Sequence, residues 1–248
     1  MKTLLAKHRS IRKFRSEPIA PEVLQDMLEA ASRASTCGNM QLYSLIVTQS
    51  RELREALAPC HFNQPMVTQA PCVITVCADV HRFSMWCEQR DAEPCYDNFA
   101  WFLNGVTDAL LAAQNLCVEA EAHGLGSGSL GTTIYTAEEI ARILDLPKGV
   151  IPVTTIVVGH PDESPELTDR LPLDAVVHCE KYHHYTSSEI DELWAEKETS
   201  EETRRLLEEN GLPNLAQIFT RNRYRAEDNL AISRNYFALL KKQGFFNN

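Results

Sequence analysis

The spacing of apolar residues predicts helices along much of the chain. Apolar side chains recur every three to four positions from Pro21 to Ala31, which indicates an amphipathic helix with Pro21 suited to its first position. Residues 98–123 carry a broader apolar stripe between good helix formers, so we expect a long and largely buried helix there. Thr136 to Glu139 has the pattern of a capping box that opens a further helix.

Short runs of β-branched and apolar residues predict three strands, at 42–48, 72–77 and 153–158. The glycine-rich segment 124–131 is expected to end the long helix, because glycine accepts the conformations that helix termination needs. Helical patterns outweigh strand patterns, and the two alternate with short loops between them. This arrangement indicates an α/β or α+β layer architecture.

The last third of the chain has a different pattern. Strand signals end at about Pro172, and two charged helical patterns follow, near 188–210 and 226–243. We find no internal repeat and no low-complexity stretch. The last third therefore resembles an appendage that packs on a partner.

Length and charge narrow the class of protein. The chain has 248 residues and an ordinary apolar fraction, which favours one compact domain or a domain with an appendage. Its formal net charge of −10 argues against nucleic acid as a partner. The most apolar segment, 99–118, is interrupted by Asn104 and Asp108, and the N-terminus lacks an export signal. We therefore expect a soluble protein without a membrane partner.

The eight cysteines are scattered through apolar segments without paired spacing, so we interpret them as mostly buried thiols in a reducing cytoplasm. Neither a structural metal site nor a nucleophile elbow is indicated. Cys37 has no resolving CxxC partner, which favours a loop residue over a redox-active thiol.

The clearest candidate for ligand binding is the basic stretch from His8 to Arg12. Arginine can fork onto phosphate oxygens and Ser10 can donate a hydrogen bond, so a phosphate monoester is a natural ligand. A solvated basic turn is the alternative reading.

Three motifs resemble those of the FMN-dependent nitroreductases. They are His8-Arg9-Ser10-Ile11-Arg12-Lys13-Phe14, Cys37-Gly38-Asn39-Met40-Gln41 and Gly124-Leu125-Gly126. Residues 164–172 and 242–245 are similar to the larger oxygen-insensitive NADPH nitroreductases and NADPH-flavin oxidoreductases. The resemblance implies an α+β fold of three layers, with a central mixed sheet flanked by helices. It also implies an FMN-binding core at 1–172 and a helical extension at 173–248 that wraps around the partner of a homodimer.

The resemblance further implies which residues contact FMN. Those assigned to the phosphate and the ribityl chain are His8, Arg9, Ser10, Arg12 and Arg170. Those assigned to the flavin ring are Gly38, Gln41, Gln64, Ser129, Leu130 and Gly131, the glutamines through their amides and the last three through the backbone. Surface glutamines and helix-ending glycines are the alternative readings.

Two departures from the family pattern leave questions open. Thr168 stands where the family usually has a lysine, so one phosphate contact is in doubt. Arg221, Arg223 and Arg225 only approximate the stretch that binds the 2′-phosphate of NADPH, and a solvated loop explains them equally well. The preference between NADPH and NADH thus stays open.

The activity implied is a two-electron transfer from NAD(P)H to nitroaromatic, quinone or flavin acceptors by a ping-pong mechanism. Because the cofactor carries the chemistry, no catalytic side chain is named. A non-catalytic flavin-binding module is one alternative, and it would bind flavin without consuming NAD(P)H. A helical interaction protein that binds an acidic partner through residues 221–225 is another.

Overall fold

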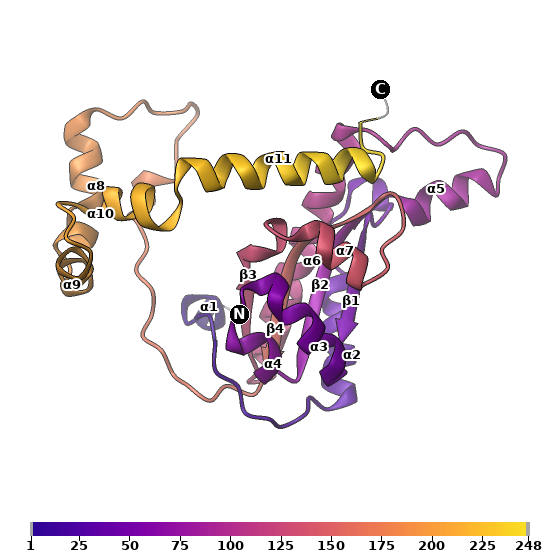
Figure 1. The fold of residues 1–248 in the computed structure, drawn as a ribbon, viewed down its shortest axis with the longest axis horizontal. Coiled ribbons are helices and arrows are strands. Elements are labelled where there is room, and N and C mark those ends of the chain that lie inside the picture. The colour runs from indigo at the N-terminus through magenta and orange to yellow at the C-terminus, as the bar shows by residue number, and fades with distance from the viewer. Residues whose placement is uncertain (1, 247–248) are drawn as a thin grey trace. The chain divides into compact units, whose positions relative to one another are not determined.

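The computed structural model describes residues 2–246, which form two compact units. The first unit contains residues 2–166 and 232–246, and the second contains residues 167–231. The final helix, α11 (Ala226–Lys242), begins in the second unit and ends in the first (Figure 1). The expected FMN-binding core at 1–172 and the dimerisation role of 173–248 stay predictions.

The first unit is built on a four-stranded sheet. Its strands are β1 (Tyr43–Thr48), β2 (Cys72–Asp79), β3 (Gly126–Leu130) and β4 (Val150–Gly159), in the order β1-β2-β4-β3. All neighbouring strands are antiparallel, so the expectation of a mixed sheet is wrong for the described strands. The strand order explains this result. Strands β2 and β3 run in the same direction, but they do not pair with each other because β4 lies between them.

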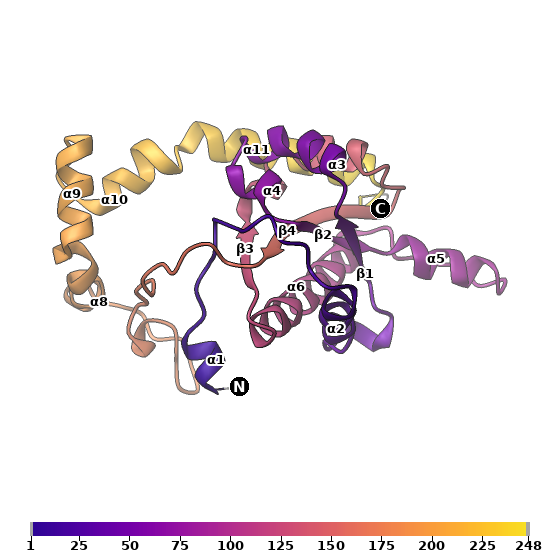
Figure 2. The ribbon, with the colours of Figure 1, turned by 90° about the horizontal axis from the view of Figure 1, so that it is seen from below.

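Helices cover both faces of the sheet, as Figure 2 shows. On one face lie α2 (Pro21–Ser32) and α6 (Phe99–Ala122), whose buried side chains include Met27 and Leu116. On the other face lie α3 (Arg51–Leu57) and α4 (Pro65–Gln69). The α+β class with three layers is confirmed.

The long central helix matches its prediction closely. Asn98 caps α6, because its side chain accepts a hydrogen bond from the Trp101 amide at 3.3 Å. The predicted strands at 72–77 and 153–158 are also confirmed, although β2 and β4 both extend further than expected.

The glycine-rich segment after α6 does more than end the helix, because five of its residues form strand β3. A Cβ on Gly126 would lie 2.5 Å from Cγ1 of Ile11, and one on Gly128 would lie 2.7 Å from the Ile11 carbonyl oxygen. These two glycines are therefore required for the N-terminal segment to cross the strand closely. Within residues 124–131, Gly124 is the glycine with the left-handed conformation, with φ of 73°.

Helix α7 (Ala137–Ile143) begins where the sequence predicts, but the expected capping box is absent. The Thr136 hydroxyl instead donates to the Cys60 carbonyl at 2.6 Å. Glu139 pairs with Arg142, whose Nε lies 2.9 Å from the carboxylate. Both side chains thus have partners that compete with the cap.

The second unit is helical, with α8 (Ser187–Thr199), α9 (Glu201–Asn210) and α10 (Leu215–Ile218). The single pattern predicted at 188–210 is two helices, because Ser200 ends α8 and its hydroxyl caps α9 through the Thr203 amide at 3.1 Å.

The remaining elements are short. They are helices α1 (Lys2–Ala6) and α5 (His81–Glu88), the 3-10 turns Cys37–Asn39, Ala58–His61, Gly131–Ile134 and Leu173–Ala175, and the π-helical turn Phe219–Arg223. Among the described residues no helix combines the length and apolarity needed to cross a bilayer. All eight cysteines are free and five are buried, which confirms their interpretation as mostly buried thiols.

Candidate functional site

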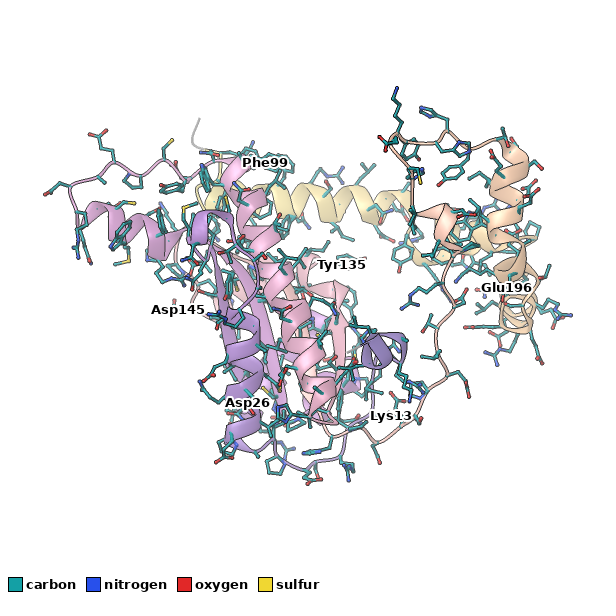
Figure 3. The ribbon with its side chains drawn as sticks, turned by 180° about the vertical axis from the view of Figure 1, so that it is seen from behind. Lys13, Asp26, Phe99, Tyr135, Asp145 and Glu196 are labelled. Carbon is teal, nitrogen blue, oxygen red and sulfur yellow. The ribbon has the colours of Figure 1, made fainter. Side chains whose placement is uncertain are left out.

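The N-terminal segment is fixed against the edge of the sheet. The Ile11 amide donates to the Ser127 carbonyl on β3 at 2.8 Å, and the Arg15 amide donates to the His160 carbonyl at 2.9 Å. The side chains of Ile11 and Phe14 are buried. Figure 3 shows Lys13 on this segment and Phe99 at the first turn of α6, at the other end of the unit. These contacts place residues 8–15 in a defined position along β3.

A cavity of about 150 Å³ lies where this segment, α6, β3 and β4 meet. It is lined by His8, Ser10, Leu110, Ala113, Gln114, Cys117, Ser127, Ser129, Thr154 and Ile156. On its wall Ser129 Oγ lies 3.1 Å from Thr154 Oγ1. The wall thus combines hydroxyl and amide groups with the apolar face of α6.

His8 has a defined orientation at this cavity. Its Nδ1 forms a short hydrogen bond with the Glu121 carboxylate near the end of α6, which leaves Nε2 on the opposite edge of the ring. Ser10 and Ser129 line the same cavity. The structure therefore brings together three of the predicted site residues.

The predicted arginines do not line the cavity. The Arg9 guanidinium donates to the carbonyls of Lys7 at 3.3 Å and Pro165 at 2.7 Å. The Arg12 side chain is exposed, while its amide donates to the Glu163 carboxylate at 2.5 Å.

Arg170 belongs to the second unit and is exposed. Its guanidinium donates to the carbonyls of Thr168 at 3.2 Å and Asp169 at 2.9 Å.

Gly38 and Gln41 lie on an exposed loop that precedes β1. Gly38 has φ of 56° and Gln41 has φ of 54°, so both adopt the left-handed conformation. The Gln41 carbonyl accepts a hydrogen bond from the Arg82 guanidinium. Neither residue lines the cavity.

The remaining predicted residues lie around the end of β3. Leu130 is buried at the last position of the strand, whereas Gly131 is exposed, with no heavy atom within 4 Å of where a Cβ would be. Next to Gly131, the Thr132 hydroxyl lies 2.9 Å from Nδ1 of the buried His61. The backbone N–H of Gln64 donates to the His61 carbonyl at 3.1 Å.

Sequence reasoning missed several residues of this region. Gln114 and Thr154 line the cavity, but in the sequence they lie within a predicted helix and a predicted strand and belong to no motif. An exposed polar residue beside an apolar stripe was the available signal for Gln114. Cys117 also lines the cavity, and burial raises the pKa of its thiol. That thiol is therefore protonated and is a poor nucleophile.

Comparison with known proteins identifies the family. The sequence profile of the Nitroreductase family matches residues 5–160, which include the N-terminal segment, the whole sheet and every wall of the cavity. The chain belongs to the nitroreductase family. The family resemblance inferred from the three motifs is confirmed.

Individual relatives agree with this assignment. An NADPH-dependent oxidoreductase of Staphylococcus aureus is 35% identical over 184 residues, which cover 73% of each chain. A protein of Bacteroides fragilis described as a candidate oxidoreductase has a solved structure that superposes with a TM-score of 0.97 at 46% identity, covering 99% of this chain and 100% of its own. The NADPH:FMN oxidoreductase of Vibrio harveyi, solved with NAD+, has a TM-score of 0.82 at 26% identity over 100% and 99% of the two chains.

Proposed function

We propose that the chain is an NAD(P)H-dependent FMN oxidoreductase that passes an electron pair from the reduced nicotinamide to a nitroaromatic, quinone or flavin acceptor. Membership of the nitroreductase family supports the class of reaction. The observation that carries the proposal is the cavity at which His8, Ser10 and Ser129 meet, held in place by the crossing of the N-terminal segment over β3.

The chemistry of this cavity fits the ribityl and phosphate part of FMN. The imidazole of His8 and the hydroxyls of Ser10, Ser129 and Thr154 offer hydrogen bonds to sugar hydroxyls and phosphate oxygens. Its volume of about 150 Å³ is below the roughly 300–1,000 Å³ typical of complete small-molecule sites. One chain thus supplies one wall of the site.

The residues have separable roles in this proposal. Arg9, Arg12 and Arg170 supply positive charge for the phosphate against the acidic net charge of the chain. Gln41 and Gln64 offer amides to the pyrimidine edge of the ring, and the open space over Gly131 lets the ring approach the backbone. When bound, FMN supplies the two-electron chemistry, so the side chains bind and orient rather than react. Donor and acceptor occupy the same open side of the site in turn, in a ping-pong sequence.

A second copy of the chain completes the site in this proposal. Phe99, Leu103 and Leu110 form a stripe along α6, and each is more than two-fifths exposed. Leu110 also lines the cavity, so the uncovered apolar stripe continues into the binding wall. A homodimer would bury this stripe and close the cavity at the same time.

An anaerobic titration tests the proposal. Purified protein with FMN is mixed with NADPH or NADH while the flavin absorbance is followed, and a nitrofuran, a quinone or free FMN is then added. We expect bleaching by the donor and recovery with the acceptor. Bound flavin that stays oxidised under both donors would indicate the non-catalytic flavin-binding module instead.

A further inference from the structure

Asp108 is a buried carboxylate in the middle of α6, with only 1% of its surface exposed. Its Oδ1 accepts a hydrogen bond from the Cys37 amide at 2.9 Å, and its Oδ2 accepts one from the Leu42 amide at 3.1 Å. One carboxylate therefore holds both ends of loop 37–42, with a separate oxygen for each end.

Gly105, one helical turn before Asp108, lets the same loop approach α6 closely. A Cβ at position 105 would lie 3.1 Å from the Leu42 carbonyl oxygen and 3.1 Å from Cβ of Ala78. That carbonyl accepts a hydrogen bond from the Asp79 amide at 2.9 Å. Gly105 and Asp108 thus form a seat on α6 that receives the C-terminal end of the loop.

The loop between these two ends has an unfavourable backbone conformation. Gly38, Asn39 and Gln41 all have positive φ angles, of 54° to 56°. Residues with a Cβ adopt this region at a cost, so tertiary contacts must hold the loop in place. Asp108 supplies those contacts from inside the molecule, and Arg82 supplies one from outside, through the Gln41 carbonyl.

We propose that Asp108 is a positioning residue, which holds loop 37–42 in the conformation that presents Gly38 and Gln41 to the flavin ring. The proposal rests on the proposed function. Gly38, Asn39 and Gln41 are exposed, and Met40 is the residue between the two ends that packs against the core, so the positive φ angles belong to residues outside the core. A buried carboxylate that fixes an exposed and strained loop is typical of a preorganised binding site.

The substitution Asp108→Asn separates this role from packing. Asparagine has nearly the same shape, but its one carbonyl oxygen can accept from only one of the two amides, and its NH2 group would face the other N–H donor. The matched control is Asn115→Ala on the same helix, because Asn115 donates to the Ala30 carbonyl on α2 at 3.2 Å and does not contact the loop.

The readouts are the FMN dissociation constant, the visible spectrum of the bound flavin, and kcat and KM for the acceptor. In Asp108→Asn we expect FMN binding about tenfold weaker and a shifted flavin spectrum, since one buried donor loses its partner. In Asn115→Ala we expect neither change, even where the thermal stability falls equally. An Asp108→Asn protein with the flavin affinity, spectrum and kcat of the wild type would overturn the proposal.

Hydrogen exchange on the wild-type protein tests the two hydrogen bonds to Asp108 without any variant. The amides of Cys37 and Leu42 should exchange slowly, whereas those of the exposed residues Gly38, Asn39 and Gln41 should exchange fast. Fast exchange at Cys37 and Leu42 would overturn the role of Asp108 even where the Asn variant fails to fold. A wild-type protein that binds no FMN, yet protects these two amides, would instead refute the proposed function alone.

Discussion

His61 Nδ1 lies 2.9 Å from the Thr132 hydroxyl oxygen, and its Nε2 is buried with no hydrogen-bond partner among the described residues. The ring joins the turn Ala58–His61 to the turn Gly131–Ile134, which follows β3 at the candidate site. Burial lowers the pKa of His61 to about 4, so the imidazole is neutral at pH 7. This pKa makes the stability of the region depend on pH.

We predict that the burial of neutral His61 lowers the free energy of unfolding in mild acid. The folded-state pKa of about 4 lies below the ordinary value of 6.5, so the unfolded chain binds one more proton between these two pH values. The contribution of His61 to the free energy of unfolding is therefore complete above pH 6.5. It falls by up to about 3 kcal/mol as the pH drops to 4. Urea unfolding of the wild type and of His61→Gln at pH 7 and pH 5 measures it. Equal losses in the two proteins would contradict the prediction.

Gly128→Ala should destabilise the protein by about 1–3 kcal/mol, because the new Cβ would meet the Ile11 carbonyl oxygen rather than a flexible side chain. The displaced N-terminal segment should also bind FMN less tightly. Gly131→Ala is the control for stability, since it has open space at that position, and its unfolding free energy should stay within about 0.5 kcal/mol of the wild type. Denaturant unfolding and FMN titration measure the two effects.

Leu103→Lys should convert the proposed homodimer to a monomer with weakened FMN binding. Leu103 is 47% exposed in the single chain, so lysine costs little there, whereas burying its charge in an interface costs much. Sedimentation and flavin titration test the two losses together. A wild-type monomer that binds FMN normally would refute the dimer proposal.

If Arg9 and Arg170 bind the phosphate as proposed, Arg9→Ala and Arg170→Ala should each weaken FMN binding by about 10- to 100-fold, because each would remove a charge-assisted hydrogen bond. Riboflavin, which lacks the phosphate, serves as the matched ligand, and its affinity should be unchanged in both variants. Full flavin occupancy in the double variant would show that the phosphate site lies elsewhere.

Much of the fold could be predicted from local patterns. The helix predicted at 21–31, the long helix predicted at 98–123 and the strands β1, β2 and β4 follow from apolar spacing and turn chemistry. Strand β3 could not be predicted, because its glycines are explained only by Ile11, which lies more than a hundred positions away in sequence. The prediction of a capping box at Thr136 was wrong because of another contact between residues far apart in sequence. The Thr136 hydroxyl donates to the Cys60 carbonyl instead of accepting from the helix.

The site was less predictable than the fold. The motif at 8–12 indicated which side chains to examine, but the cavity also depends on Gln114 and Thr154, which carry no motif. In the sequence, Asp108 stands out only as a charged residue that interrupts an apolar run. A carboxylate on the buried stripe of a helix is itself a signal, because it requires partners, yet only the fold shows that these are the amides of Cys37 and Leu42.

The order of the strands also affects how the chain folds. Every residue of β2 pairs with β4, although about seventy residues separate the two strands in sequence. Their pairing cannot form on the ribosome until residue 159 has emerged, and closing so long a connection costs entropy before any pairing repays it. Between the end of α6 at Ala122 and the end of β4 at Gly159, the nascent chain therefore holds an apolar helix with only β1 and β2 of its sheet, a stage at which apolar surface is open to aggregation.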